Sequence, residues 1–137
     1  MKEEERVCVV LYKLMGDSPR YAVLKRVKNW EGWELVKGHL EDGLEETARQ
    51  EVKEETGIEE IKSIEPLECE AGWTYEEDGE EVQTRCDCFL VQVGEDASVS
   101  VDQNPHEEHE HGYFLNHRDA RDILTHDTQR RLLSLAR

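Results

Sequence analysis

The sequence has few prolines, no long apolar run and far fewer basic than acidic residues. With three prolines and no repeat or low-complexity stretch, nothing marks a linker, so residues 1–137 are expected to form a single domain. The apolar run at residues 7–11 is far shorter than the roughly 18 residues that a spanning helix needs. It follows the acidic run Glu3-Glu4-Glu5, so no membrane anchor or secretory signal is expected.

The shortage of positive charge restricts the possible partners. The chain has 33 acidic and 17 basic residues, a formal net charge of -16. A surface of this sign repels a polyanionic duplex, so double-stranded DNA is not an expected partner. Small phosphorylated ligands that bind together with divalent cations remain compatible with it.

Four cysteines, Cys8, Cys69, Cys86 and Cys88, occur at irregular spacings. Without a secretory start, this pattern predicts reduced thiols in a cytoplasmic protein. Cys86 and Cys88 are expected on one face of a strand, because neighbouring residues point to opposite faces.

The order of the expected elements predicts a mixed α/β domain rather than a parallel βαβ repeat. Strands are expected at residues 6–14 and 20–26, joined by a turn at 16–19, and a Trp-rich stretch at 30–36 precedes a glycine-bearing segment at 38–43. A helix is expected at 44–56, ended by Gly57. Two strands, 61–75 and 82–93, flank an Asp78-Gly79 turn, and a polar loop (94–106), a short strand (112–115) and a helical region (119–137) complete the chain.

The predicted helix has one apolar face and one polar face. Leu44, Ala48 and Val52 fall on the side expected to face the core. On the opposite side, Glu45 and Arg49 are spaced for an i,i+4 ion pair.

Three carboxylates break this amphipathic pattern. Glu51 and Glu55 fall in the sector of Leu44, and Glu54 lies beside them. Crowding like charges near a low-dielectric interior is unfavourable unless a cation neutralises them. Mg²⁺ prefers carboxylate and phosphate oxygens, so the pattern indicates a metal site. The alternative is a solvated acidic patch at a frayed helix end.

Residues 38–58, GHLEDGLEETARQEVKEETGI, resemble the signature box of the Nudix hydrolases. The second half of the box is in register at Glu51, Val52, Glu54, Glu55, Gly57 and Ile58. The first half is two residues shorter, and Leu44 and Gln50 stand where the box has Glu and Arg. The resemblance implies an α+β fold, an α/β/α sandwich with a mixed β-sheet, in which the box forms a loop–helix–loop.

Two flanking motifs are similar to those of the diadenosine tetraphosphate (bis-nucleosyl tetraphosphate) hydrolase branch. They are WELVKGH at residues 33–39 and EHEHGYFL at residues 108–115. In that branch the glutamate of the second motif helps to hold metal, so the resemblance gives this role to Glu108.

The resemblance therefore implies a Mg²⁺- or Mn²⁺-dependent pyrophosphohydrolase whose partner is a small nucleotide, such as diadenosine tetraphosphate. One of the helix carboxylates would take the proton of the attacking water. Two alternatives are an RNA 5′-end pyrophosphohydrolase and a non-catalytic Nudix-like module that binds a nucleotide or a protein. The residues implied at the metal site are Glu51, Glu54, Glu55 and Glu108, with Lys37 at the start of the glycine segment.

Substrate contacts are expected from Gly38, His39, Trp73, Tyr75 and Arg85. A structural alternative exists for all of these except Gly38, and for Lys37 as well. Lys37 and His39 are also expected as plain exposed loop residues, the two aromatic rings as packing groups, and Arg85 as a cross-strand partner of Glu76 or Glu77. A zinc site at His106, His109 and His111 is the less favoured reading of the histidine cluster, and Asp119 is expected to support a helix cap.

Overall fold

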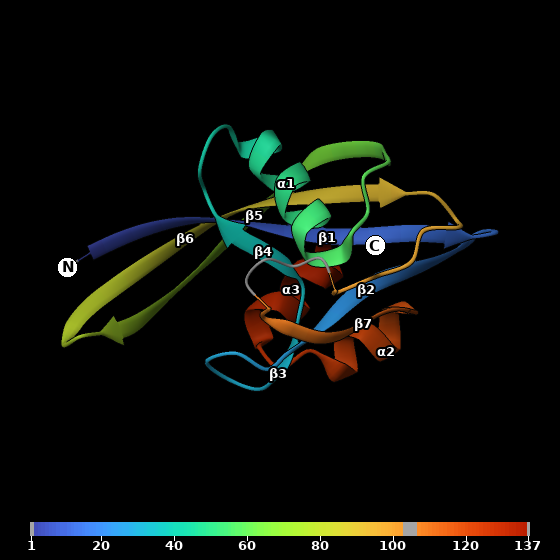
Figure 1. The fold of residues 1–137 in the computed structure, drawn as a ribbon. Coiled ribbons are helices and arrows are strands. Elements are labelled where there is room, and N and C mark those ends of the chain that lie inside the picture. Colours follow the sequence, from blue (N-terminus) through green and yellow to red (C-terminus); the bar gives the residue numbers. More distant parts are fainter. Residues whose placement is uncertain (1, 103–106, 137) are drawn as a thin grey trace.

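The computed structural model describes residues 2–102 and 107–136, and Figure 1 shows its fold. Seven strands and three helices are present in this part of the chain. In chain order they are β1 (Lys2–Met15), β2 (Ser18–Arg26), β3 (Gly32–Glu34), β4 (Val36–His39), α1 (Leu44–Thr56), β5 (Ile61–Glu77), β6 (Glu80–Val93), β7 (His109–Leu115), α2 (His117–Ile123) and α3 (Asp127–Leu135).

The strands form one mixed sheet. Its order is β3-β2-β1-β6-β5, with β4 paired to β1 and β7 paired to β2. β1 and β6 run parallel, whereas the other pairs are antiparallel. The end of β5, the start of β6 and the start of β1 extend past the helices (Figure 1).

Alternation along β1 divides the core into two layers, one on each face of the sheet. Val7, Val9 and Leu11 pack with Ala48 and Val52 of α1. The intervening residues of β1 pack on the other face with α3 and the end of α2 (Figure 1). The predicted α/β/α sandwich with a mixed sheet is therefore confirmed.

Helix α1 has the predicted bounds. Gly57 ends it with φ +76°, a left-handed conformation that favours glycine, and its backbone N–H donates to the Lys53 carbonyl at 2.8 Å. The Glu45–Arg49 ion pair is present at 3.1 Å. The core-face prediction is wrong for Leu44, which is 41% exposed because it lies in the first turn of the helix, beyond the edge of the sheet core.

The hairpins agree with the predicted turns. Met15 and Ser18 face each other across the turn Gly16-Asp17, and Glu77 and Glu80 face each other across the turn Asp78-Gly79. Residues 94–102 form neither helix nor strand, as expected for the polar loop, and the end of that loop lies outside the described residues.

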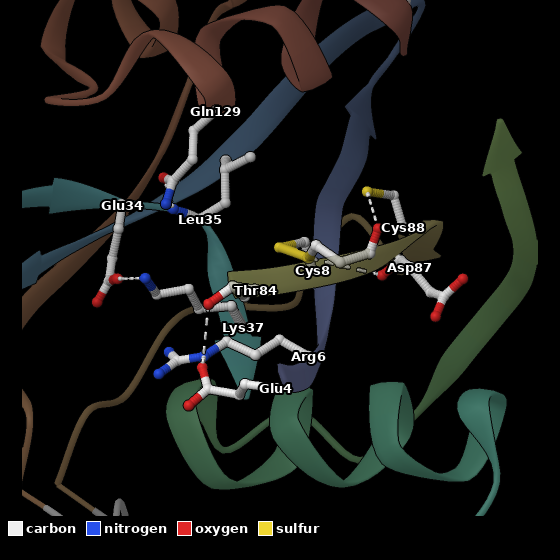
Figure 2. The surroundings of a disulfide bond; sticks show 11 residues. Glu4, Arg6, Cys8, Glu34, Leu35, Lys37, Thr84, Asp87, Cys88 and Gln129 are labelled. Atoms are coloured by element: carbon white, nitrogen blue, oxygen red, sulfur yellow. Dashed lines mark hydrogen bonds and ion pairs between the residues drawn. A yellow bond between two sulfur atoms is a disulfide. The ribbon is translucent and has the colours of Figure 1, made fainter. Parts of the chain in front are cut away.

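Two predicted elements are divided in the structure. The stretch at residues 30–36 supplies β3 and β4, which are separated at Leu35 because its backbone N–H donates to the Gln129 side chain at 2.8 Å instead of to a strand (Figure 2). The region at residues 119–137 supplies α2 and α3, since the chain leaves the helix at Leu124. Thr125 in that break pairs with the free edge of β3 through both backbone groups of Trp33.

The prediction of reduced thiols is wrong for Cys8 and Cys86, which form a disulfide (Figure 2). In the parallel register Cys8 lies opposite Cys88, and Cys86 is two residues away on the same face, as the alternation predicted. Cys88 is buried and takes no part in this disulfide. The side chain of Cys69 lies outside the described part.

No helix in the described ranges is both long and apolar enough to cross a bilayer.

The disulfide closes a loop with a sequence separation of 78, which predicts a measurable contribution to stability. Reduction of the wild-type protein is expected to lower the free energy of unfolding by about 2–4 kcal/mol, because the cross-link restricts the unfolded chain. Urea unfolding with and without reductant measures this difference. The effect of reductant should vanish in Cys8→Ala and persist in Cys88→Ala. Alkylation of Cys8 and Cys86 in unfolded protein that has not been reduced would show that the disulfide is absent and would contradict the prediction.

Candidate active site

The acidic residues of α1 differ sharply in their surroundings. Glu55 faces the sheet and is only 3% exposed, whereas Glu51 and Glu54 are half-buried at the same side of the helix. Gln50 donates a hydrogen bond to Glu54 Oε1 at 2.8 Å. The predicted inward direction of these carboxylates is thus present, and the alternative of a frayed acidic end does not fit a buried Glu55.

Gly38 allows Glu51 to approach the backbone of β4. A Cβ atom built on Gly38 would collide with the Glu51 carboxylate, so a larger residue would push this side chain away. Gly38 and His39 belong to strand β4 rather than to a loop. Pairing of β4 with β1 thus brings Gly38 next to Glu51.

A buried His–Glu pair lies against Glu55. His109 Nε2 is 2.8 Å from Glu34 Oε2 and 3.7 Å from Glu55 Oε1, and the side chains of His109 and Glu34 are 0% exposed. Glu34 lies opposite Leu24, a member of the core layer beneath α1, so it points to the same face of the sheet as that helix.

Arg26 links Glu34 of this pair to Glu108, in the motif at residues 108–115. Its Nη1 lies 3.0 Å from Glu34 Oε2 and 3.3 Å from Glu108 Oε2. The backbone N–H of Val27 also donates to the Glu108 carbonyl at 2.9 Å. Glu108 is thereby held beside the α1 carboxylates, as the sequence predicted.

Lys37 has a different position from the one expected. Its Nζ lies 3.5 Å from Glu34 Oε1, and the two side chains point toward one another (Figure 2). The prediction of an exposed loop residue is wrong, because Lys37 lies in β4 and its side chain is 11% exposed. An ammonium group has no lone pair for a metal. The Lys37 side chain therefore neutralises Glu34 and is not a metal ligand.

Burial and like charge destabilise the ionised carboxylates of α1. Burial raises the pKa of Glu51 to about 7, and the charges of Glu54 and Glu108 act in the same direction. Burial also raises the pKa of Glu55 well above its ordinary value, followed by the charges of Glu34 and Glu51. Ionisation of this cluster is therefore unfavourable unless a positive charge lies close to it.

Glu34 behaves in the opposite way. Burial alone would raise its pKa, but hydrogen bonding by His109 and the charges of Lys37 and Arg26 hold the pKa below its ordinary value. Burial lowers the pKa of Lys37, against the opposing effect of Glu34. Glu34 is therefore an ionised carboxylate with its own positive partners.

The donor set of the cluster fits a hard divalent cation. Both oxygens of Glu55 are buried and no N–H or hydroxyl group donates to them, although the Glu51 carboxyl group is close enough to share a hydrogen bond with Glu55. The side chains of Glu51, Glu54 and Glu108 offer further carboxylate oxygens. Mg²⁺ and Mn²⁺ bind such ligands. Among the residues that the structure describes, no three His, Cys, Asp or Glu side chains already converge as a finished ligand set.

Trp73 and Tyr75 lie on β5, and the Trp73 ring is close to the ammonium group of Lys37. Lys37 Nζ is 5.1 Å from the centre of the Trp73 ring, and Arg6 Cζ is 5.8 Å from it. The Tyr75 hydroxyl donates to Glu4 Oε2 at 2.8 Å. Trp73 packs against the core layer beneath α3, so the packing alternative is confirmed for it, and base stacking stays a prediction.

Arg85 is not brought together with these two rings. It lies opposite Gly72, whereas Trp73 lies opposite Thr84, so alternation directs Arg85 to the other face of the sheet. The alternative pairing with Glu76 or Glu77 does not follow the register either, because these residues lie opposite Glu81 and Glu80.

The remaining predicted residues lie at the margin. His39 is 60% exposed, with its Nδ1 3.9 Å from Glu4 Oε2. His111 stacks on Tyr113, away from the buried His109, and His106 lies outside the described residues. Asp119 supports the cap of α2 as expected, since its backbone N–H donates to Asn116 Oδ1 at 2.8 Å.

Sequence reasoning missed Arg26 and Glu34, and it considered His109 only for zinc. One signal for Glu34 was available: a charged residue between Trp33 and the apolar pair Leu35-Val36. The partners of Glu34 come from β2 and β7, so no local pattern links them.

A family model described as the NUDIX domain matches residues 4–135. No curated protein matches the sequence.

Solved structures share the fold at low identity. A C. elegans Ap4A hydrolase in a binary complex has a TM-score of 0.72 and 21% identity, over 96% of this chain and 93% of that one. The NUDIX domain of Shewanella oneidensis NrtR, complexed with ADP ribose, has a TM-score of 0.75 and 16% identity, over 99% and 87%. The E. coli dihydroneopterin triphosphate pyrophosphohydrolase has a TM-score of 0.77 and 16% identity, over 98% and 96%.

The raised pKa of Glu51 predicts how stability depends on pH. The folded protein favours the protonated form, so this contribution to stability is complete below pH 4.5 and is lost as the pH rises through about 7. Without metal, the melting temperature is expected to fall from about pH 5 to about pH 8. Glu51→Gln should reduce this slope, while Glu45→Gln, an exposed control, should retain it. Equal slopes for wild type and Glu51→Gln would contradict the prediction.

Proposed function

Because the chain belongs to the NUDIX domain family, we propose that it is a divalent-metal-dependent pyrophosphohydrolase acting on a nucleoside polyphosphate. The observation that supports this most strongly is the buried Glu55, whose two oxygens have no hydrogen-bond partner beside further carboxylates. A structural carboxylate would be paired, whereas one that binds metal keeps its oxygens available.

In this proposal Glu51, Glu54, Glu55 and Glu108 hold the metal, which is Mg²⁺ or Mn²⁺. When bound, such an ion neutralises the charge of a polyphosphate and makes water easier to deprotonate. One of the three α1 carboxylates accepts a proton from the attacking water. The water oxygen then bonds to phosphorus, while the bond between phosphorus and the bridging oxygen of the leaving group breaks. The carboxylates thus position the reactants and receive the proton.

For the substrate we propose a dinucleoside polyphosphate such as diadenosine tetraphosphate. Support comes from the motifs at residues 33–39 and 108–115, and from a fold shared with an Ap4A hydrolase. Gly38 lies beside Glu51, where phosphate groups would bind, and the exposed His39 follows it in β4. Trp73, whose ring centre lies 5.1 Å from Lys37 Nζ, and Tyr75 on the same strand are the proposed base contacts. Arg85 lies opposite Glu5 in the strand pair that places Val7 and Val9 beneath α1, so it is on the α1 face of the sheet and is a proposed phosphate contact.

Two other functions of the same fold are separable by experiment. An RNA 5′-end pyrophosphohydrolase is disfavoured by the net charge of -16. A non-catalytic nucleotide-binding module would not need Glu51, Glu54 and Glu55 together. We also propose a cytoplasmic location, for which the nucleotide substrate is the remaining support.

Replacement of Glu54 tests the catalytic proposal. Glu54→Gln is expected to lower kcat by about 10²–10⁴-fold, because it removes a carboxylate that binds metal or accepts the proton. Release of phosphate or nucleotide products at saturating Mg²⁺ measures the effect, and the melting temperature should stay close to the wild-type value. Glu45→Gln, on the exposed side of α1, is the matched control. Wild-type turnover in Glu54→Gln would exclude the assignment.

A panel of substrates tests the specificity. Dinucleoside polyphosphates, nucleotide sugars, nucleoside triphosphates and 5′-triphosphorylated RNA are assayed at several salt concentrations, and the highest kcat/KM is expected for a dinucleoside polyphosphate. Preference for the RNA would favour the first alternative. Nucleotide binding in calorimetry without any hydrolysis, across Mg²⁺ and Mn²⁺, would favour the binding module.

A further inference from the structure

The ring of His109 lies between two buried carboxylates that have different roles. Its Nε2 is 2.8 Å from Glu34 Oε2 but 3.7 Å from Glu55 Oε1. The ring therefore forms a hydrogen bond with Glu34, while Glu55 lies beyond hydrogen-bond distance.

The chemistry of Glu34 determines where the imidazole proton lies. An ionised carboxylate only accepts hydrogen bonds, so the contact at 2.8 Å requires a proton on His109 Nε2. This N–H is directed at Glu34 and not at Glu55. Glu55 therefore lies against the ring, with its Oε1 3.7 Å from His109 Nε2, and neither Glu55 oxygen accepts a hydrogen bond from His109.

Glu34 also binds Arg26, which contacts Glu108 in the motif at residues 108–115. The same atom, Glu34 Oε2, also receives Arg26 Nη1 at 3.0 Å, and Arg26 reaches Glu108 Oε2 at 3.3 Å. Lys37 lies 3.5 Å from the other oxygen of Glu34. Glu34 is thus the common anchor of two groups, His109 and Arg26, each of which touches a different proposed metal ligand.

We propose that His109 is a positioning residue that orients Glu55 for the divalent cation, and that Glu34 holds the His109 ring in this orientation. The proposal rests on the proposed function, since it concerns the same site. It adds a role for two buried residues that would not touch substrate or metal. Residues that surround and orient metal ligands commonly change metal affinity by about 10–100-fold when they are replaced.

The test is the affinity of the full chain for Mn²⁺, measured from the free Mn²⁺ signal in electron paramagnetic resonance. His109→Leu is expected to raise the Kd for Mn²⁺ by about 10–100-fold. His109→Gln should recover part of the loss, because its amide N–H can donate to Glu34. His111→Gln, a change to an exposed residue on the same strand, should leave the Kd at the wild-type value.

Kinetics provide a second readout that a purely structural role would not produce. The Mg²⁺ concentration for half-maximal activity should rise in His109→Gln by the same factor as the Kd, while KM for the nucleotide at saturating Mg²⁺ stays unchanged. A variant that merely lost folded protein would show a lower kcat with no change in metal dependence, and this result would overturn the proposal.

Further outcomes separate this proposal from the proposed function. A wild-type Kd for Mn²⁺ in folded His109→Leu would overturn the positioning role alone. If His109→Leu does not fold, Glu34→Gln decides instead: weaker Mn²⁺ binding supports the proposal, and unchanged binding overturns it. A wild-type protein that binds no Mn²⁺ would overturn the proposed function and this role together. If Glu54→Gln binds Mn²⁺ more weakly while His109→Leu binds it with the wild-type Kd, the proposed function is retained and only the positioning role is overturned.

Discussion

Repulsion between buried carboxylates on one helix is the constraint on which the site depends. Glu51 and Glu55 are one turn apart on α1, and the negative charges of Glu34 and Glu108 lie close to them. Hydrophobic packing of α1 through Ala48 and Val52 forces this proximity, because the same helix face carries the carboxylates into the sheet. Folding thereby creates a site of high negative potential that favours a divalent cation.

The protein compensates for only part of this charge with its own groups. Arg26, Lys37 and His109 surround Glu34, so its pKa is held below the ordinary value even though the side chain is fully buried. Glu55 has no comparable partners, and its pKa is raised. Glu34 therefore has positive partners at both oxygens, although its Oε1 has only the ion pair with Lys37 and no hydrogen bond, whereas both Glu55 oxygens have no hydrogen-bond partner. This difference in charge compensation matches structural support for Glu34 and ligand binding for Glu55.

The local parts of this arrangement were predictable from sequence, and the long-range parts were not. The bounds of α1, the Gly57 cap and the inward direction of Glu55 follow from helical periodicity and glycine conformation. The contact of Glu34 with His109 joins residues 75 apart, and it depends on the pairing of β2 with β3 and β7. Likewise, the Cys8–Cys86 disulfide depends on a parallel register that spacing does not show, and it removes the thiol argument for a cytoplasmic location.

Proton release on metal binding tests the central claim most directly. Glu51, with a pKa of about 7, is partly protonated in the metal-free protein at neutral pH, and a cation must displace that proton. Calorimetric titration of Mn²⁺ at about pH 7 in buffers of different ionisation enthalpy measures the number of protons released. The account predicts a release that is lost in Glu51→Gln. Binding of Mn²⁺ with no proton release in the wild-type protein would contradict it.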